Sequence, residues 1–321
     1  MNPRSRVLLL GWRLAGRLPQ GVVFAVMDVA ATGAWLARGS GVRQLETNLH
    51  RVVPLAHERE IRRLSRENMR RYLRYYGETF MLGRVSPEQL LALVRPEGDQ
   101  DVRDAIDEEH SALLALGHQG NYDLAGWWAT AHIAPVTTVA ERLEPPEVFE
   151  EFVALREHNG LTIIPLDDGR DVFRNLLRAV KGGGALVPLL ADRDLTSRGI
   201  EVDMFGHRAR VAAGPAALAV STRTALFATM IRHERLHGAA RRAAGSRWGI
   251  VLSFVRVPPV DPTLPRSQQV TALTQGWVDV LAADIRAHPA DWHMLQKVFV
   301  ADLDPERAAR AAARTGAAPG A

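Results

Sequence analysis

Short apolar runs alternate with segments of helical spacing from residue 111 onward in this 321-residue chain. The run over 111–117 is almost wholly apolar, and a short run of this kind bounded by turn residues predicts a buried strand. Residues 121–132 then have the spacing of a helix. The pattern repeats, with strands predicted over 135–140, 161–166 and 185–190, helices over 146–159 and 170–181, and the glycine run 182–184 after the second of these helices. Repeated strand–helix–strand units predict a mixed, largely parallel α/β sheet covered by helices.

The later part of the chain predicts further elements around the same sheet. Residues 196–210, rich in glycine and polar side chains, are expected to form a loop over the site. A helix begins at Gly214-Pro215, because proline suits the first helical turn. Two more strands are expected over 226–232 and 248–257, joined by an exposed hairpin over 233–247, with a long helix over 267–288 and a closing segment over 292–300.

These elements predict one domain over residues 1–303. It consists of a helical N-terminal part over 1–90 and an α/β core over 110–300. The tail over 304–321 is rich in alanine, arginine and glycine and is expected to be disordered.

Two apolar runs near the N-terminus, over 7–12 and 21–37, predict helices that lie on a membrane surface. Neither run approaches the roughly 20 uninterrupted apolar residues of a membrane-spanning helix. Trp12, Phe24 and Trp35 are the expected interfacial anchors, because aromatic side chains favour that depth. The alternative is that both runs form ordinary helices packed on the domain.

Residues 58–82 predict a long amphipathic helix. Its apolar positions recur at helical spacing from Ile61 to Phe80, and six arginines between positions 62 and 74 supply a basic face. A basic face next to aromatic residues fits anionic headgroups, and it equally fits a solvated surface.

Composition narrows the chemistry. Hydrophobic residues make up 47% of the chain and charged residues 24%, as in a globular protein. The chain has no cysteine, which excludes thiolate catalysis, disulfides and cysteine-bound metals. The net charge is +4, and Lys181 and Lys297 are the only lysines, so arginine supplies almost all basic groups. Arginine binds phosphate and carboxylate through a planar fork, although a GC-rich genome produces the same bias.

Charged and polar residues follow successive predicted strands. His118, Glu141, Asp167 and Asp192 each come just after the carboxyl end of a strand. In open α/β sheets ligands bind beyond these ends. The four side chains are therefore expected to line one edge of the sheet.

His118 and Asp123 form an H-x-x-x-x-D pair. On a regular helix, residues five apart are rotated by roughly 140°, so the two meet only if His118 precedes the helix. Asn121 is a competent N-cap for that arrangement. A neutral imidazole held by a carboxylate can abstract a proton from a hydroxyl, which is general-base catalysis. On its own the pair is equally typical of an ordinary turn.

Asp192 and Asp194 flank Arg193 at another strand end, where aspartates can orient His118, bind a metal or cap the loop. A metal site made of His118, Asp167, Asp168 and Asp192 is chemically reasonable but matches no recognised spacing. The glycine run lacks a phosphate-loop pattern, and the chain has no G-x-S-x-G elbow. The histidines without a visible partner are interpreted as structural: His207, His233, His237 and His293.

The stretch Gly117–Gly126 resembles the histidine motif of the actinobacterial phosphatidylinositol mannoside acyltransferases, relatives of the lipid A late acyltransferases. The resemblance continues through blocks that lie in order across about 110–300: Val139–Leu143, Ala154–Glu157, Ala191–Thr196, Gly199–Gly206, Ala213–Ala216 and Asp291–Gln296. Several spaced blocks are far more specific than the short H-x-x-x-x-D pair.

The resemblance implies an enzyme, peripheral on the cytoplasmic leaflet and its anionic surface, that moves a long-chain acyl group from acyl-CoA to a mannose hydroxyl of a phosphatidylinositol mannoside. It implies no metal or other cofactor and no nucleic-acid partner. In that family the histidine is the base and an acid aligned with Asp192 pairs with it. Glu141 and Arg156 align with residues near the acceptor, Arg193 lies near either substrate, and Glu201 is also expected to bind substrate.

This chain departs from the family at the acid. The family motif is glutamate-arginine-aspartate where this chain has Asp192-Arg193-Asp194. The shorter acid leaves Asp123 and Glu201 open as alternative partners of His118. Three other functions also stay open: a metal-dependent phosphohydrolase that uses the aspartate cluster, an acyltransferase for a different glycolipid, and a catalytically silent membrane-binding protein.

Overall fold

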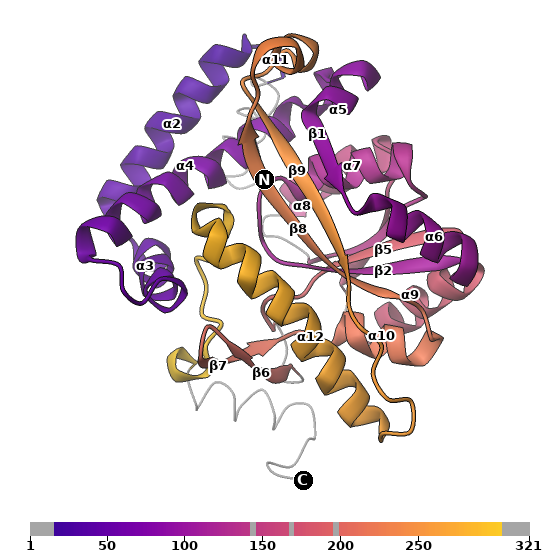
Figure 1. Ribbon diagram of the computed structural model, residues 1–321. Coiled ribbons are helices and arrows are strands. Elements are labelled where there is room, and N and C mark those ends of the chain that lie inside the picture. The colour runs from indigo at the N-terminus through magenta and orange to yellow at the C-terminus, as the bar shows by residue number, and fades with distance from the viewer. Residues whose placement is uncertain (1–15, 142–145, 167–169, 195–198, 304–321) are drawn as a thin grey trace.

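The computed structural model describes residues 16–141, 146–166, 170–194 and 199–303. Its centre is a five-stranded mixed sheet in the order β1-β9-β8-β2-β5 (Figure 1). Within this sheet only β8 and β9 are antiparallel to each other. The strands are β1 (Val94–Glu97), β9 (Trp248–Arg256), β8 (Leu226–Arg235), β2 (Ser111–Leu116) and β5 (Ala185–Leu190). The prediction of a mixed, largely parallel sheet covered by helices is confirmed.

Two smaller sheets flank the central one. Strands β3 (Thr137–Glu141) and β4 (Thr162–Leu166) pair in parallel, and a bridge from Val136 to Leu186 attaches them beside β5. Strands β6 (Ile200–Met204) and β7 (His207–Val211) form an antiparallel hairpin. The order of elements therefore brings the ends of β2, β5 and β3 to one edge.

Helices cover both faces of the central sheet, and β2 is therefore buried on both sides. Leu113 and Ala115 face a core formed with helices α9 (Arg170–Gly182), α10 (Gly214–Thr222) and α12 (Arg266–Ala287). The alternate residues Leu114 and Leu116 face a second core, formed with α5 (Pro87–Leu93), α6 (Asp99–Glu109), α7 (Tyr122–His132) and α8 (Pro146–His158). Burial on both faces explains why β2 is a continuous apolar run instead of an alternating one.

The predicted loop over 196–210 is wrong. Residues 200–204 and 207–211 are the strands β6 and β7, joined at Phe205 and Gly206, which both have positive φ. Two successive residues with positive φ are typical of the tight turns that join hairpin strands. The alternation of Val202 and Met204 with charged neighbours carries the strand period, and this pattern was overlooked.

The hairpin expected over 233–247 is present with different bounds. Strand β8 continues to Arg235, and helix α11 (Gly238–Ala244) occupies the tip before β9 begins at Trp248 (Figure 1).

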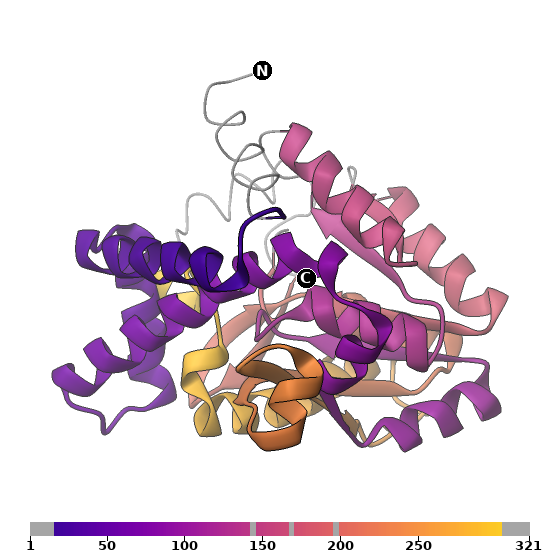
Figure 2. The same ribbon diagram turned by 90° about the horizontal axis from the view of Figure 1, so that it is seen from above.

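The N-terminal helices lie together at one side of the sheet (Figure 2). They are α2 (Gln20–Ala37), α3 (Ser40–Val52) and α4 (Glu58–Met81), the last followed by a short 3-10 turn, η1 (Leu82–Arg84). By length and composition α2 is apolar enough to cross a membrane, although one of its faces packs along α4. Residues 1–15, including Trp12, and 304–321 lie outside the described residues.

Two of the three expected interfacial anchors face the protein instead. The Trp35 indole Nε1 donates to Ser65 Oγ at 3.0 Å, and the Arg62 guanidinium lies 4.2 Å from the indole centroid. Phe24 lies near Gly77 on α4, beneath the Arg74 guanidinium. The large exposed hydrophobic side chains of α2 are aliphatic, because the aromatic positions fall on the side that meets α4.

The basic face of α4 is divided between the interior and solvent. Arg63, Arg66 and Arg70 are exposed, whereas Arg71 and Arg74 are partly buried beneath the sheet edge. Arg71 forms ion pairs with Glu67 and with Asp291.

Gly120 in the turn after β2 should tolerate no side chain. Its φ is +51°, and a Cβ atom would lie 2.7 Å from both the carbonyl oxygen and Cγ2 of Ile231. We expect Gly120→Ala to lower the free energy of unfolding by about 2 to 4 kcal/mol, measured by urea denaturation. Gly33→Ala is the control, because nothing lies within 4 Å of that Cβ. It should be neutral or slightly stabilising, and equal losses in both variants would contradict the assigned strain.

Candidate active site

His118 lies in a turn between β2 and α7. Asn121 caps the helix, its Oδ1 accepting from the Leu124 backbone N–H at 2.9 Å. His118 therefore precedes the helix, as the sequence predicts. Asn121 also donates to Glu78 on α4 at 3.0 Å, so the same side chain ties the turn to the N-terminal helices.

The carboxylate of Asp192 faces His118. His118 Nδ1 lies 2.5 Å from Asp192 Oδ1, and the His118 backbone N–H donates to Asp192 Oδ2 at 2.9 Å. Strand register explains the pairing: Leu116 is opposite Leu190 in parallel strands, and two further residues along each strand lead to His118 and Asp192. A short acid is sufficient because the two strands are direct neighbours.

A third donor satisfies the same carboxylate. The indole Nε1 of Trp292, a fully buried residue, donates to Asp192 Oδ2 at 2.8 Å. Asp192 is itself fully buried, and burial alone would raise its pKa. The facing imidazole and the donated hydrogen bonds outweigh burial and lower the pKa of Asp192 below its ordinary value. The acid is therefore ionised at neutral pH.

An ionised Asp192 determines which nitrogen of His118 is basic. Nδ1 must carry the proton that it shares with the carboxylate, so a neutral ring has its lone pair on Nε2. The His118 side chain is 21% exposed, and Nε2 has no hydrogen-bond partner within the part of the chain that the structure describes. This arrangement can accept a proton from a bound hydroxyl group.

The segment 289–294 holds the histidine turn from behind. It contains a 3-10 turn, η2 (Pro289–Asp291). The His293 backbone N–H donates to the His118 carbonyl at 2.7 Å, and the Gly120 N–H donates to the Asp291 carbonyl at 3.2 Å. Asn68 on α4 fastens this segment in turn, donating to the Trp292 carbonyl at 2.7 Å.

The other candidate for pairing, Asp123, is bound elsewhere. Its carboxylate accepts from Arg156 Nε at 2.7 Å and from the Tyr75 hydroxyl at 2.8 Å. Burial raises the pKa of Tyr75 well above its ordinary value, and Asp123 adds to the shift, so the hydroxyl stays protonated as a donor. The structure thus brings Asp123 and Arg156 together, and it gives His118 a different acid.

None of the other predicted site residues that the structure describes forms a hydrogen bond or ion pair with His118. Arg193 donates to Glu141 at 3.1 Å, and its buried Nε has no partner among the described residues. Glu201 on β6 pairs with Arg210 at 3.0 Å and does not contact His118. Asp167 and Asp168 lie outside the described residues.

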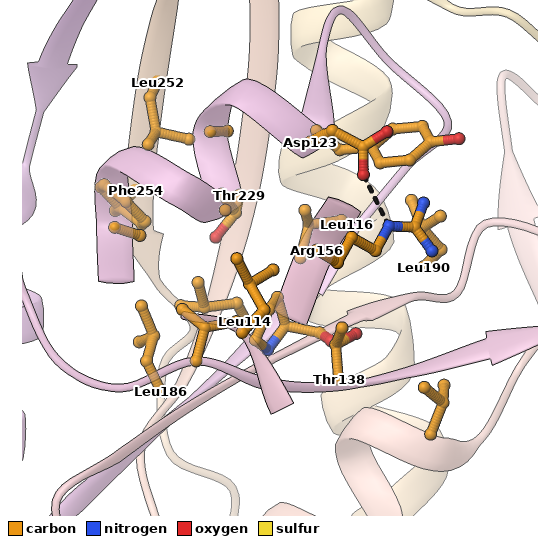
Figure 3. Close-up of a pocket in the computed structure, with 18 residues that line it drawn as sticks. Leu114, Leu116, Asp123, Thr138, Arg156, Leu186, Leu190, Thr229, Leu252 and Phe254 are labelled. Atoms are coloured by element: carbon orange, nitrogen blue, oxygen red, sulfur yellow. Dashed lines mark hydrogen bonds and ion pairs between the residues drawn. The ribbon is translucent and has the colours of Figure 1, made fainter. Parts of the chain in front are cut away.

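An apolar cavity of about 80 Å³ lies against β2 and β5 (Figure 3). Leu116 and Leu190 line it, and these residues lie two positions before His118 and Asp192. The Asp123–Arg156 ion pair lies at one end, while most of the wall is aliphatic, including Leu114, Leu186 and Leu252.

A family model described as "Bacterial lipid A biosynthesis acyltransferase" matches residues 6–300. The chain belongs to this acyltransferase family. It is 38% identical over 301 residues to the phosphatidylinositol mannoside acyltransferase of Mycolicibacterium smegmatis, an alignment that covers 94% of this chain and 92% of that protein. The corresponding protein of Mycobacterium tuberculosis is 38% identical over 308 residues, covering 95% of this chain and 91% of that protein. The resemblance inferred from the motifs is confirmed.

Beneath the site of this acyltransferase lies a buried ionic cluster that joins α4, β8 and η2. His233 Nδ1 is 3.0 Å from Asp291 Oδ1, and His233 Nε2 faces Glu78 at 3.5 Å. Arg71 reaches the second oxygen of Asp291 at 2.5 Å. Burial would lower the pKa of His233, but Asp291 and Glu78 raise it to about 9. Burial and the neighbouring His233 charge lower the pKa of His293 to about 3.

Sequence reasoning missed most of this supporting layer. His233 and His293 were interpreted as structural, but the partners of His233 lie 58 residues away at Asp291 and on α4. Trp292 belongs to the block Asp291–Gln296, which was assigned no role. The available signal was composition: a block with an acid, an indole and an imidazole in succession supplies three polar groups that need partners when buried.

The raised pKa of His233 makes stability depend on pH in a defined window. Because the folded pKa exceeds the ordinary 6.5, protonation stabilises the fold fully below pH 6.5, and this contribution is lost as pH rises through about 9. Across that window we expect the wild type to lose on the order of 3 kcal/mol of unfolding free energy relative to His233→Gln. Urea denaturation at several pH values measures this difference.

The matched control is His237→Gln, because His237 is exposed at the start of α11. Its stability should follow the wild type at every pH. His293, with a lowered pKa, affects stability below pH 6.5 and so outside the window. A difference between wild type and His233→Gln that stays constant from pH 6.5 to 9 would contradict the assignment.

Proposed function

We propose that this protein transfers a long-chain acyl group from acyl-CoA to a mannose hydroxyl of a mannosylated phosphatidylinositol. The observation that carries the proposal is the His118–Asp192 pair, with Nε2 unpartnered among the described residues and Asp192 fully buried. The names of the mycobacterial relatives support the acceptor. The proposed reaction requires no metal and no covalent acyl-enzyme.

The proposed steps follow from the geometry of the pair. The acceptor hydroxyl oxygen attacks the thioester carbonyl carbon while His118 Nε2 takes the hydroxyl proton. Asp192 stabilises the resulting imidazolium through Nδ1. When the tetrahedral intermediate collapses, the carbon–sulfur bond breaks and the departing CoA sulfur takes the proton from Nε2. The products are the ester and CoA, and His118 is neutral again.

The negative charge on the oxygen of the tetrahedral intermediate is stabilised best by a hydrogen-bond donor that is already in position. Arg193 is our candidate, because its buried Nε has no partner among the described residues and it directly follows Asp192. Its other end is held by Glu141 at 3.1 Å, which fixes the guanidinium. Glu141 and Arg156 are proposed to bind the acceptor sugar near this point.

The apolar cavity is the proposed place for acyl carbons next to the thioester. Its aliphatic wall includes Leu116 and Leu190 at the ends of β2 and β5, two residues before His118 and Asp192. A volume of about 80 Å³ corresponds to a few water molecules, so only part of a long acyl chain fits this cavity. The Asp123 carboxylate, which accepts from Arg156 Nε and from Tyr75, is proposed to hold α7 and α8 together around the cavity instead of orienting His118.

We place the enzyme peripherally on the cytoplasmic face of the membrane. The acceptor is a lipid, so the active site must meet a membrane, and the exposed aliphatic face of α2 supports surface attachment. A different glycolipid acceptor stays an alternative. For the phosphohydrolase alternative, the described residues contain no group of three potential metal ligands, and both oxygens of Asp192 already accept hydrogen bonds.

His118→Ala should abolish acyl transfer. Purified protein given long-chain acyl-CoA and a mannosylated phosphatidylinositol should release CoA, detected with a thiol reagent, and removing the base should lower the rate by roughly 10² to 10⁴-fold. His158→Ala, at the exposed end of α8, is the matched control and should keep the wild-type rate. Undiminished activity in His118→Ala, or loss of wild-type activity with a chelator, would contradict the mechanism.

Trp292→Phe should lower kcat while leaving the KM for acyl-CoA unchanged. The variant keeps an aromatic ring but removes one hydrogen bond to a carboxylate, which is worth about 1.5 to 3 kcal/mol, or roughly 10 to 100-fold in rate. Asp192→Asn should cost more, because the partner of the imidazolium is lost. If Trp292→Phe lowers thermal stability but leaves kcat unchanged, Trp292 has only a packing role and the positioning assignment is wrong.

A further inference from the structure

The tip of the β8–β9 hairpin lies next to the N-terminal end of α2 (Figure 1), and the residues of these elements line a basic groove. It has a volume of about 890 Å³ and is walled by α2, α4, α11 and the ends of β8 and β9. Five arginines line it, against one acid, Asp28: Arg74, Arg235, Arg241, Arg242 and Arg247. Neither the proposed reaction nor the supporting ionic cluster accounts for this arrangement.

Most of these arginines lack a carboxylate partner. Within the described ranges, no ion pair joins Arg235, Arg241, Arg242 or Arg247 to an acid. Arg74 has only a long contact with Glu78, at 3.9 Å. Five arginines against one acid leave an excess of positive charge that attracts an anion to the groove.

Trp248, which lines the groove, contacts two of these guanidinium groups. Arg235 and Arg74 lie 4.9 Å and 5.1 Å from the centroid of the Trp248 ring, which attracts cations to its face. Burial lowers the pKa of Arg74, the charges of Glu78 and Asp28 oppose this shift, and the nearby Arg235 charge adds to it. The side chains thus present planar forks that suit phosphate oxygens.

An apolar ridge runs beside the groove on the outward side of α2. Val22, Val26, Val29 and Leu36 recur at helical spacing and are 45%, 56%, 74% and 65% exposed. Gly21, Ala25 and Asp28 on the same helix line the groove, so the ridge and the groove are adjacent. A soluble anion needs no neighbouring apolar ridge, whereas a phospholipid offers a phosphate group and hydrocarbon chains side by side.

We propose that this groove binds the phosphate group of an anionic phospholipid at a membrane surface, with the α2 ridge inserted among the neighbouring acyl chains. The site is separate from the acyl-transfer chemistry. Strand β8 is parallel to β2 with Thr229 opposite Leu116, and it continues to Arg235 beyond the end of β2. The groove therefore lies toward the same edge of the sheet as His118, so a membrane bound there would be near the active site.

Vesicle flotation with the full-length protein tests this proposal. Phosphatidylcholine vesicles with and without phosphatidylinositol are the probes. We expect the wild type to prefer the anionic vesicles, and the double variant Arg241→Glu with Arg242→Glu to bind them at least roughly tenfold less. Raising the salt concentration should reduce the preference, because exposed charges are screened.

The control for net charge is Arg174→Glu with Arg178→Glu, two exposed arginines on α9. It changes the net charge equally and should bind like the wild type. Equal losses in both double variants would show a general charge effect and overturn the groove assignment, as would wild-type binding by the groove variant. Circular dichroism confirms that each variant is folded.

Two further arms identify the ligand. Val26→Ser with Val29→Ser should weaken vesicle binding, and full binding by this variant would overturn the role of the ridge. Inorganic phosphate should compete poorly at concentrations equal to the lipid phosphate, and strong competition would show a free-anion site instead. His118→Ala should bind vesicles like the wild type, so a failure of the proposed acyl transfer is distinguished from a failure of this proposal.

Discussion

The structure depends most on a buried carboxylate that must stay charged. Asp192 has no exposed surface, and an ionised carboxylate in that position is stable only if donors surround it. The donors are the His118 ring, the His118 backbone N–H and the Trp292 indole. Because these groups come from positions 74 and 100 residues away from the acid, satisfying one charge joins three distant segments. The contacts that stabilise the buried charge in the folded protein are therefore the same contacts that orient His118 as a base.

The N-terminal helices belong to this arrangement because they hold the segment that carries Trp292. Asn68 on α4 binds the Trp292 carbonyl, and Arg71 on the same helix binds Asp291. Asp291 in turn meets His233 on β8. Removing one member of such a buried pair leaves an uncompensated charge, which is costly. The inner face of α4 is thus constrained by the site, while the outer face of α2 is free to be apolar.

Local patterns predicted most strands and helices of the core but not their neighbours in space. The turn at His118 and its Asn121 cap follow from short-range chemistry, and the structure has both. The choice between Asp123, Asp192 and Glu201 required knowing that β5, which precedes Asp192, lies beside β2, whereas β6, which carries Glu201, belongs to a separate sheet. Trp292 could not be assigned, since an indole buried for packing and one that donates to Asp192 are identical in sequence. The β6–β7 hairpin was missed because its charged positions obscured a two-residue period.

The catalytic pair and the basic groove use charge in opposite ways, and this difference separates their roles. Both carboxylate oxygens of Asp192 accept hydrogen bonds from within the protein. Its charge therefore stabilises the His118 ring and does not bind an outside ligand. In the groove, which also contains Asp28, four arginines form no ion pair with an acid among the described residues, so their charge is available to an outside ligand. Exposed, unmatched charge of one sign attracts a partner from solution and is weakened by salt, whereas buried, matched charge is insensitive to salt. Raising the salt concentration should therefore weaken binding of this enzyme to an anionic membrane while leaving the His118–Asp192 pair intact.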